Sequence, residues 1–365
     1  MKKIFIFGYY GFQNSGDEAI LEAIIQQIKT VLPDAELRAL SYNARDTQSK
    51  HRIPAVSRNN FSQVIRAIRE SDIVISGGGS ILQDVTSSRS LLYYSAIIYL
   101  AKLMDKKVMF YGNGFGPINR PLNRMIIRFI VNKVDSITVR DFESKEYMKS
   151  LGVKKNISVT ADIALGLTGD KDEKIKQIML RENINREEKW VGISVRPWKN
   201  QEDYKKVIAK TADHLIGKNY RIVFIPMQFP TDVLVSREIA GLMEGQPQII
   251  ERQYKPRELI GLIGNLNFLL GMRLHSLIFA AMGGVPMVGL EYDVKIKNFL
   301  KIVNQKNAGP IEGLDFTNMW QIIEDMLRNR EEYVRILKKS KESLDKRLET
   351  NMDIFRDLIY EGVGE

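Results

Sequence analysis

Residues 4–18 read IFIFGYYGFQNSGDE, and this stretch decides the fold. Residues 4–7 form an unbroken apolar run, typical of a strand that a parallel sheet buries on both faces. A glycine-rich turn follows, and a helical pattern begins near Asp17. Such strand–turn–helix units bind anionic ligands, because backbone N–H groups and the helix N-terminus point at the ligand. The stretch therefore predicts an α/β protein with a ligand-binding loop near its start.

This loop matches neither common nucleotide-binding motif. Residues 11–16 have the spacing of a phosphate loop, but Asp17 stands where that loop carries its lysine. A carboxylate at that position repels a nucleotide phosphate. The glycines at positions 8, 11 and 16 also miss the G-x-G-x-x-G spacing of dinucleotide-binding loops. We therefore expect a ligand other than ATP or NAD.

The composition is that of a globular, cytoplasmic protein. The 365 residues contain no cysteine, which excludes disulfides, thiolate metal sites and cysteine nucleophiles. We find neither a signal-peptide pattern nor about 18 successive uncharged apolar residues. The net charge of +10 suits phosphorylated substrates or an anionic membrane surface. No nucleic-acid partner is expected, because RNP, zinc-finger and long basic patterns are missing from the sequence.

Two series of alternating strand and helix patterns divide the chain, separated by a polar, charged segment at 166–189. We predict Rossmann-like domains over 1–168 and 186–330, with a cleft between them. A helical tail follows over 331–365, with one candidate break near Asn351. The predicted strands are 4–7, 37–40, 73–75, 108–111 and 137–139, then 190–195, 221–225, 248–250, 268–270 and 286–290.

Glycines and polar residues cluster after the predicted strands 73–75 and 108–111, at the sheet edge where open α/β proteins bind ligands. Glycines let a ligand approach the backbone closely, and free N–H groups before a helix attract anions or hydroxyls. We predict a sugar-binding surface here, with ordinary turn glycines as the alternative. Together with the first loop, its members are Asn14, Asp17, Gly78, Gly79, Gln83, Asp84, Thr86, Ser87, Ser88, Arg89 and Asn113.

Three positions after strands predict a cationic pocket. Arg140 can hold a carboxylate or phosphate bidentately, and a structural pair with Asp141 is the equal alternative. His275 follows Arg273 at a helix start, where the helix dipole favours the neutral imidazole that proton transfer near pH 7 requires. Lys295 either completes this pocket or is solvated like its neighbours.

The remaining charged residues carry weaker predictions. His51 is expected in an exposed basic loop and His214 on an amphipathic helix, both incidental to function. Arg120, Arg124 and Arg128 share one helix face, for which a solvated surface is the default and contact with anionic lipid or a diphosphate is the alternative. No metal site is predicted, because the acidic residues show no ligand spacing. These are Asp17, Asp84, Asp141 and Asp162.

Several motifs in order resemble the polysaccharide pyruvyltransferase family, most closely its subgroup that pyruvylates cell-wall polymers for S-layer anchoring. The likeness spans about residues 1–305. One local difference is Asn113, where related chains often carry glutamine. The motifs are GYYGFQNSGDE (8–18), SGGGSILQD (76–84), TSSRS (86–90), GNGFGP (112–117), RD (140–141), RPW (196–198) and MRLH (272–275).

The resemblance implies a two-domain fold like that of GT-B glycosyltransferases. It also implies ketal transfer of a pyruvyl group from phosphoenolpyruvate onto a sugar, typically the 4,6-hydroxyls of β-D-ManNAc in a lipid-diphosphate-linked precursor of a secondary cell-wall polymer. No cofactor is implied besides this donor substrate. The expected location is the cytoplasm, at the inner face of the membrane. The family's donor-site positions are matched here by Tyr10, Phe12, Arg140, His275 and Lys295.

The chemistry of this reaction fits the same residues. Phosphoenolpyruvate carries a carboxylate and a phosphate, and Arg140 and Lys295 are the candidate anion holders. Ketal formation moves several protons, and His275 is the side chain of this set whose ordinary pKa suits that task. Tyr10 and Phe12 would offer a face to the sugar or the enol. We therefore predict His275 and Arg140 as catalytic and the others as substrate-binding.

Two other classes of function fit the same fold. A GT-B glycosyltransferase would use a nucleotide-sugar donor and release a nucleotide. A non-catalytic protein that binds a sugar or a lipid diphosphate would show affinity without turnover. The first is the main alternative.

Overall fold

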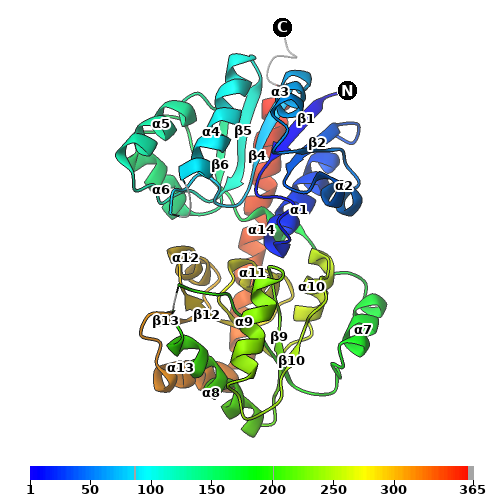
Figure 1. The fold of residues 1–365 in the computed structure, drawn as a ribbon, viewed down its shortest axis with the longest axis vertical. Helices are drawn as coiled ribbons and strands as arrows, with labels where there is room; N and C mark the ends of the chain where they lie inside the picture. The colour runs from blue at the N-terminus through cyan, green and yellow to red at the C-terminus, as the bar shows by residue number, and fades with distance from the viewer. Residues whose placement is uncertain (86–87, 200, 361–365) are drawn as a thin grey trace. The chain divides into compact units, whose positions relative to one another are not determined.

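The computed structural model describes residues 1–85, 88–199 and 201–360. They form two compact α/β units, each built on its own parallel sheet (Figure 1). This confirms the predicted fold class of two Rossmann-like domains. Unit 1 comprises Met1–Gln13, Asp17–Gly166 and Leu344–Glu365, and unit 2 comprises Asn14–Gly16 and Leu167–Ser343.

Unit 1 has a seven-stranded parallel sheet in the order β3-β2-β1-β4-β5-β6-β7. The strands are β1 (Lys3–Phe7), β2 (Glu36–Ser41), β3 (Ala55–Ser57), β4 (Ile73–Gly77), β5 (Lys107–Asn113), β6 (Ser136–Val139) and β7 (Ser158–Val159). The helices are α1 (Ser15–Val31), α2 (Ala44–His51), α3 (Phe61–Glu70), α4 (Ser88–Leu103), α5 (Pro121–Val131) and α6 (Phe142–Ser150), followed by the 3-10 turn η1 (Ile163–Gly166).

The central strands of unit 1 coincide with the apolar runs of the sequence, because both faces of the sheet are covered by helices. Phe5, Phe7 and Phe110 are fully buried in its core. The edge strands β3 and β7 were not predicted. Each is only two or three residues long and half-buried, so it carries no apolar run.

Unit 2 has a six-stranded parallel sheet in the order β10-β9-β8-β11-β12-β13. The strands are β8 (Trp190–Ser194), β9 (Arg221–Phe224), β10 (Gln248–Ile249), β11 (Phe268–Gly271), β12 (Met287–Glu291) and β13 (Lys306–Pro310). The helices are α7 (Asp172–Arg181), α8 (Asp203–Gly217), α9 (Thr231–Ala240), α10 (Pro256–Ile263), α11 (Leu274–Met282), α12 (Val294–Ile302) and α13 (Phe316–Arg328).

The C-terminal helix α14 (Arg330–Tyr360) is continuous, without the break considered near Asn351. Asn351 is instead buried, and its side-chain oxygen hydrogen bonds to the Thr138 hydroxyl of β6. Phe355 packs edge-on against Tyr111 with ring centroids 5.9 Å apart. Helix α14 is therefore not simply a C-terminal extension, because from Leu344 onward it belongs to the core of unit 1.

Phe355→Ala should lower the free energy of unfolding by about 3–5 kcal/mol, because it removes a fully buried aromatic ring and leaves a cavity. Chemical denaturation followed by circular dichroism would measure this. Tyr360→Ala, at a position 53% exposed on the same helix, should change stability by less than about 0.5 kcal/mol. Equal effects of the two variants would contradict the docking of this half of the helix.

Candidate functional site

The glycine-rich loop after β1 turns Tyr10 inward. Its ring is 1% exposed, and its hydroxyl donates a hydrogen bond of 2.6 Å to the Gly77 carbonyl at the end of β4. Burial raises the pKa of this phenol well above its ordinary value, and the charges of Asp17 and Glu18 add to the effect. The prediction that Tyr10 offers a face to a substrate stays a prediction, and the structure shows the ring buried and its hydroxyl bonded within the protein. Tyr10 joins two loops.

The aromatic surface of this loop is formed by other residues. Phe12 is half-buried between Tyr9 and Tyr42, with ring centroids 3.9 and 4.6 Å away and nearly parallel planes. The Arg58 guanidinium lies 5.5 Å from the Phe12 ring centroid. Tyr42 remains 55% exposed. Phe12 thus belongs to an aromatic stack with Tyr9 of the same loop and Tyr42, which the sequence analysis missed because Tyr42 follows a different strand, β2.

A buried hydrogen bond between Glu18 and His51 supports the same loop. The Glu18 carboxylate accepts a hydrogen bond of 2.8 Å from Gly11 N, and its other oxygen lies 2.7 Å from His51 Nε2. The His51 side chain is 4% exposed, at the last residue of α2. The expectation of an exposed loop at His51 is therefore wrong. Gly11 has φ +79° and a Cβ there would lie 2.2 Å from Ser41 Oγ, so the loop requires glycine.

The loops after β4 and β5 are tied together through Asn113. This side chain is 2% exposed, and its Nδ2 donates to Ser76 Oγ (3.1 Å) and the Gly78 carbonyl (3.0 Å). Asn113 is therefore a structural residue, and its predicted contact with substrate stays a prediction. Gly78 and Gly79 both have positive φ, at +61° and +65°. A Cβ at Gly79 would lie 3.4 Å from Asp17 Oδ1, so the two predicted residues are neighbours.

Asp84 is also turned inward. Its carboxylate accepts hydrogen bonds from Asn119 N (2.7 Å), Arg120 N (3.0 Å) and Asn123 Nδ2 (2.8 Å). Burial raises the pKa of Asp84, but these three donors outweigh burial and hold it below its ordinary value. Asp84 fixes the chain that leads into α5, and its predicted role in substrate binding stays a prediction.

The other polar residues of this segment differ in their surroundings. Gln83 is half-buried, and its side-chain oxygen accepts a hydrogen bond of 2.7 Å from Val85 N. Arg89 is exposed in the first turn of α4. Thr86 and Ser87 of the TSSRS motif lie outside the described residues. Of this group, Arg89 is a side chain that a ligand in solution can reach.

Arg140 is held in a buried network at the carboxyl end of β6. It contacts Asp141 (3.3 Å), Asp162 (3.2 Å) and Ser80 Oγ (3.2 Å), and it is 8% exposed. Burial lowers the pKa of Arg140, but the two carboxylates outweigh burial and raise it. Gly114 must be glycine here, because a Cβ would lie 2.7 Å from the guanidinium carbon. The contact with Asp141 is the structural pairing that the sequence left as the alternative, and the contact with Ser80 ties Arg140 to the loop after β4. The predicted catalytic role of Arg140 stays a prediction.

A cationic cluster lies in unit 2, at the carboxyl ends of the adjacent strands β8, β11 and β12. Arg196 follows β8, Arg273 follows β11, and Tyr292 and Lys295 follow β12. The Arg196 guanidinium is 4.6 Å from the Tyr292 ring centroid, and Lys295 Nζ is 5.3 Å from it. We define Arg196, Arg273, Lys295 and Tyr292 as the cationic cluster. Arg196 was noted only within a motif, so its place here is new.

The charge of this cluster acts on Tyr292. Burial raises the pKa of the Tyr292 phenol, but the positive charges of Lys295, Arg196 and Arg273 outweigh burial and lower it. Lys295 is also 3.2 Å from Asp293 and its side chain is 28% exposed. The cluster therefore favours negative charge in its vicinity, as an anion-binding site must.

The carboxylate of Asp232 orients Arg273. The Arg273 guanidinium forms a bidentate pair with Asp232, whose side chain is fully buried. Asp232 also accepts hydrogen bonds from Met227 N (3.1 Å) and Gln228 N (3.0 Å). Because every partner of Asp232 is fixed, the direction of the Arg273 side chain is fixed too.

His275 packs against the start of helix α1. Its ring lies directly beside Gly16, so close that a Cβ there would be 2.1 Å from Nδ1. Ser15 N donates a hydrogen bond of 2.8 Å to the Met227 carbonyl, and Asn14 forms a bridge with Gln228. These contacts hold residues 14–16 within unit 2.

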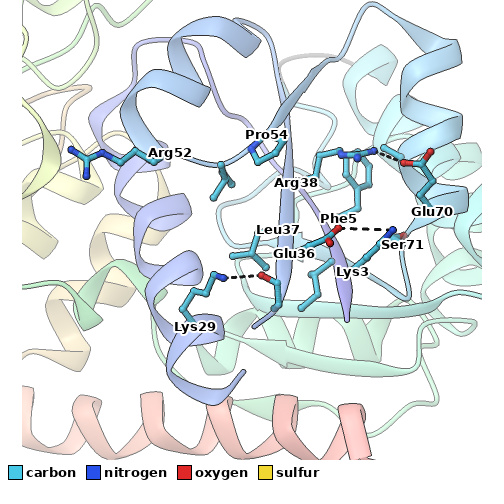
Figure 2. A pocket seen from close by; sticks show the side chains of 14 residues that line it. Lys3, Phe5, Lys29, Glu36, Leu37, Arg38, Arg52, Pro54, Glu70 and Ser71 are labelled. Atoms are coloured by element: carbon cyan, nitrogen blue, oxygen red, sulfur yellow. Dashed lines mark hydrogen bonds and ion pairs between the residues drawn. The ribbon is translucent and has the colours of Figure 1, made fainter. Parts of the chain in front are cut away.

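Unit 1 also contains a cavity at the opposite edge of its sheet, shown in Figure 2. Lys3 and Glu36 line it at the amino ends of β1 and β2. Arg38 is paired with Glu70 at 2.9 Å, and Lys29 Nζ donates to the Ala35 carbonyl at 2.8 Å. Open α/β sheets bind ligands at the carboxyl ends of strands, so this cavity is not the candidate site.

Neither a metal-binding cluster nor a membrane-spanning helix is present among the described residues. Residues 1–85, 88–199 and 201–360 contain no group of three or more His, Asp or Glu side chains that could hold a metal ion. In the same part of the chain, no helix combines the length and the apolar character needed to cross a membrane.

The fold is shared with enzymes that handle sugar nucleotides. The UDP-GlcNAc 2-epimerase of Neisseria meningitidis, bound to UDP-GlcNAc, superposes with a TM-score of 0.67 at 14% identity, covering 97% of this chain and 99% of that one. The structure of Anabaena Alr3699/HepE in complex with UDP-glucose superposes with a TM-score of 0.64 at 14% identity. This match covers 98% of the present chain and 99% of the other chain. At these identities the likeness concerns the fold, a GT-B-like pair of Rossmann units.

Sequence similarity identifies the protein family, which the likeness of folds does not. A family model described as polysaccharide pyruvyl transferase matches residues 14–294, so the chain belongs to that family. The amylovoran biosynthesis protein AmsJ of Erwinia amylovora is 24% identical over 259 residues. This alignment covers 66% of the present chain and 61% of AmsJ, so the chain spans less than two thirds of that relative.

Gly16→Ala should lower the free energy of unfolding by about 1–3 kcal/mol, because the added methyl group overlaps the His275 ring. The double variant Gly16→Ala/His275→Ala should recover most of that loss, which denaturant titration would measure. Gly217→Ala is the control, since nothing lies within 4 Å of its Cβ position. A Gly16→Ala protein as stable as the parent would contradict this packing.

Proposed function

We propose that this protein is an enzyme that transfers the pyruvyl group of phosphoenolpyruvate onto a polysaccharide sugar as a ketal and releases phosphate. Membership of the polysaccharide pyruvyl transferase family supports the pyruvyl group and the class of acceptor. The choice of phosphoenolpyruvate as donor rests on the cationic cluster of unit 2, in which three cations lie around Tyr292.

Phosphoenolpyruvate suits this cluster because it carries two anionic groups within one small molecule. Arginine holds a carboxylate or phosphate through two parallel hydrogen bonds, whereas lysine acts as a point charge. In this proposal Arg196 and Lys295 take the donor's anionic groups. Arg273 is already engaged with Asp232, so it contributes its charge and the geometry of the helix that begins beside it.

The proposed reaction has two addition steps. One sugar hydroxyl attacks C2 of the donor while the methylene carbon gains a proton, giving a tetrahedral adduct that still carries phosphate. The C2–O bond to phosphate then breaks, and the second sugar hydroxyl forms the other C–O bond and closes the ketal ring. The two hydroxyl protons balance the proton on carbon and the one on the released phosphate. We assign the proton transfer to His275, whose ordinary pKa is suited to it.

The acceptor and location are proposed from the motifs quoted above. We propose the 4,6-hydroxyls of β-D-ManNAc in a lipid-diphosphate-linked precursor, in a polymer used for S-layer anchoring. The enzyme would then work in the cytoplasm at the inner face of the membrane, without a further cofactor or a metal. The main alternative is a glycosyltransferase with a nucleotide-sugar donor, which the GT-B-like fold favours.

Phosphate release from phosphoenolpyruvate should depend on a ManNAc-containing lipid-diphosphate acceptor, and the product should gain an acid-labile pyruvyl group. A phosphate assay and mass spectrometry of the acceptor would measure both. Release of a nucleotide from a nucleotide-sugar donor, with phosphoenolpyruvate inert, would favour the glycosyltransferase. Binding of the acceptor without any turnover would indicate a non-catalytic protein.

Lys295→Met should lower kcat/KM for phosphoenolpyruvate about 100-fold, because it removes one cation from the site where donor charge develops. Steady-state phosphate release would measure the change. Lys297→Met is the matched control, since Lys297 is exposed on the same helix two residues away. Equal activity of the two variants would remove Lys295 from the donor site.

A further inference from the structure

Helices α4 and α5 of unit 1 expose large apolar side chains that neither the core nor the proposed reaction uses. On α5, Leu122 is 66%, Met125 69% and Phe129 56% exposed. Their spacing places them on one helix face. On α4, Leu103 is 61% and Tyr99 40% exposed. Scattered single exposed residues are ordinary, but successive members of one helix face are not.

These side chains form one continuous surface. The rings of Tyr99 and Phe129 lie 6.3 Å apart, which joins α4 to α5. Lys133 Nζ lies 4.7 Å from the Phe129 ring centroid. Figure 1 shows α4 and α5 beside one another in unit 1. We call the set Tyr99, Leu103, Leu122, Met125 and Phe129 the α4–α5 patch.

The charge around the patch has one sign. Residues 88–133 contain eight basic residues and one acidic residue, a net +7 of the chain's +10. Of the basic residues, those classed as exposed are Arg89, Arg120, Arg124, Arg128 and Lys133. Asp105 is the single acid in this stretch. Five exposed basic residues therefore lie on or beside the two helices that expose these apolar side chains.

We propose that the α4–α5 patch docks on an anionic lipid bilayer. A helix with apolar side chains on one face and arginine or lysine beside them lies in the plane of a membrane interface, with the apolar face among the acyl chains. Basic side chains near an anionic leaflet each add electrostatic attraction. The long stems of arginine and lysine let their charged groups reach the headgroup level.

The charge distribution selects this occupant over a second copy of the chain. Two copies that met through this patch would bring two sets of exposed arginine and lysine side chains together. Like charges placed opposite one another oppose association. An anionic bilayer offers instead a continuous surface of opposite charge, and the inference does not depend on which sugar is the acceptor.

The first test is sedimentation of the full chain with phosphatidylcholine vesicles, with and without phosphatidylglycerol. The parent protein should bind only the anionic vesicles. The triple variant Leu122→Ser/Met125→Ser/Phe129→Ser, and separately Arg120→Glu/Arg124→Glu/Arg128→Glu, should each lower the partition coefficient about 100-fold. No binding of the parent to anionic vesicles, or unchanged binding of both variants, would overturn the proposal.

Matched controls lie on unit 2. Leu180→Ser/Leu234→Ser/Leu242→Ser removes as many exposed apolar side chains. Lys206→Glu/Lys210→Glu/Lys218→Glu reverses as many charges elsewhere. Both should bind vesicles like the parent, and equal losses would mean that binding is not located on α5. Circular dichroism and thermal unfolding of every variant separate lost docking from lost folding.

A second measurement reports position directly and needs no disruptive change. Because the chain has no cysteine, a single Met125→Cys protein can be labelled with an environment-sensitive fluorophore at one place. Anionic vesicles should shift its emission to the blue. The same label at Leu180→Cys, a position 79% exposed on α7, should not respond. Equal shifts at both positions, or a shift that follows protein concentration without lipid, would overturn the proposal.

Discussion

Parallel strand pairing is the constraint on which this molecule depends. Every strand pair that the structure describes is parallel, so within each sheet all strands end at the same edge. Loops far apart in the sequence are thereby brought side by side. In unit 2 this places Arg196 and Lys295 around one tyrosine, although a hundred residues separate them. In unit 1 it places Tyr10 within reach of Gly77.

The sequence predicted the central strands of both sheets, but it missed helix α2, the edge strands β3, β7 and β13, and the direction of several side chains. Buried apolar runs predicted the central strands, because a strand covered on both faces can hold little else. The strand predicted over 4–7 is observed as β1 (Lys3–Phe7), one residue longer at its start. Short edge strands such as β3 were not predicted, because half-buried residues leave no periodic pattern of apolar residues in the sequence. Residues 331–360 read correctly as helix, but amphipathic periodicity does not say which core the apolar face joins.

Four predicted site residues have internal hydrogen-bond partners, and their contacts with a substrate stay predictions. Tyr10, Asp84, Asn113 and Arg140 are polar residues at strand ends, where a ligand and a neighbouring loop compete for the same hydrogen-bonding groups. Their partners are backbone groups, carboxylates, hydroxyls and an amide that lie up to 67 residues away, so residue type and position could not distinguish the two outcomes. Burial of a polar group without a partner is costly, and the structure resolves this by pairing these residues internally. They build the loops on which a substrate-binding surface can rest.

The net charge of +10 is arranged differently in the unit 2 cluster and around helices α4 and α5. Two carboxylates, Asp232 and Asp293, accompany the three cations of the unit 2 cluster, so that cluster carries little net charge. Its attraction for an anion comes from fixed direction and partial burial, where Coulomb interactions are strong and selective. Around α4 and α5 the opposite holds, because the arginines are exposed and acids are nearly missing from residues 88–133. Exposed charge of one sign acts over about a Debye length of 8–10 Å and selects a surface rather than a small molecule. The exposed basic residues beside α4 and α5 therefore fit the proposed bilayer contact, whereas the fixed cations of unit 2 fit the proposed donor.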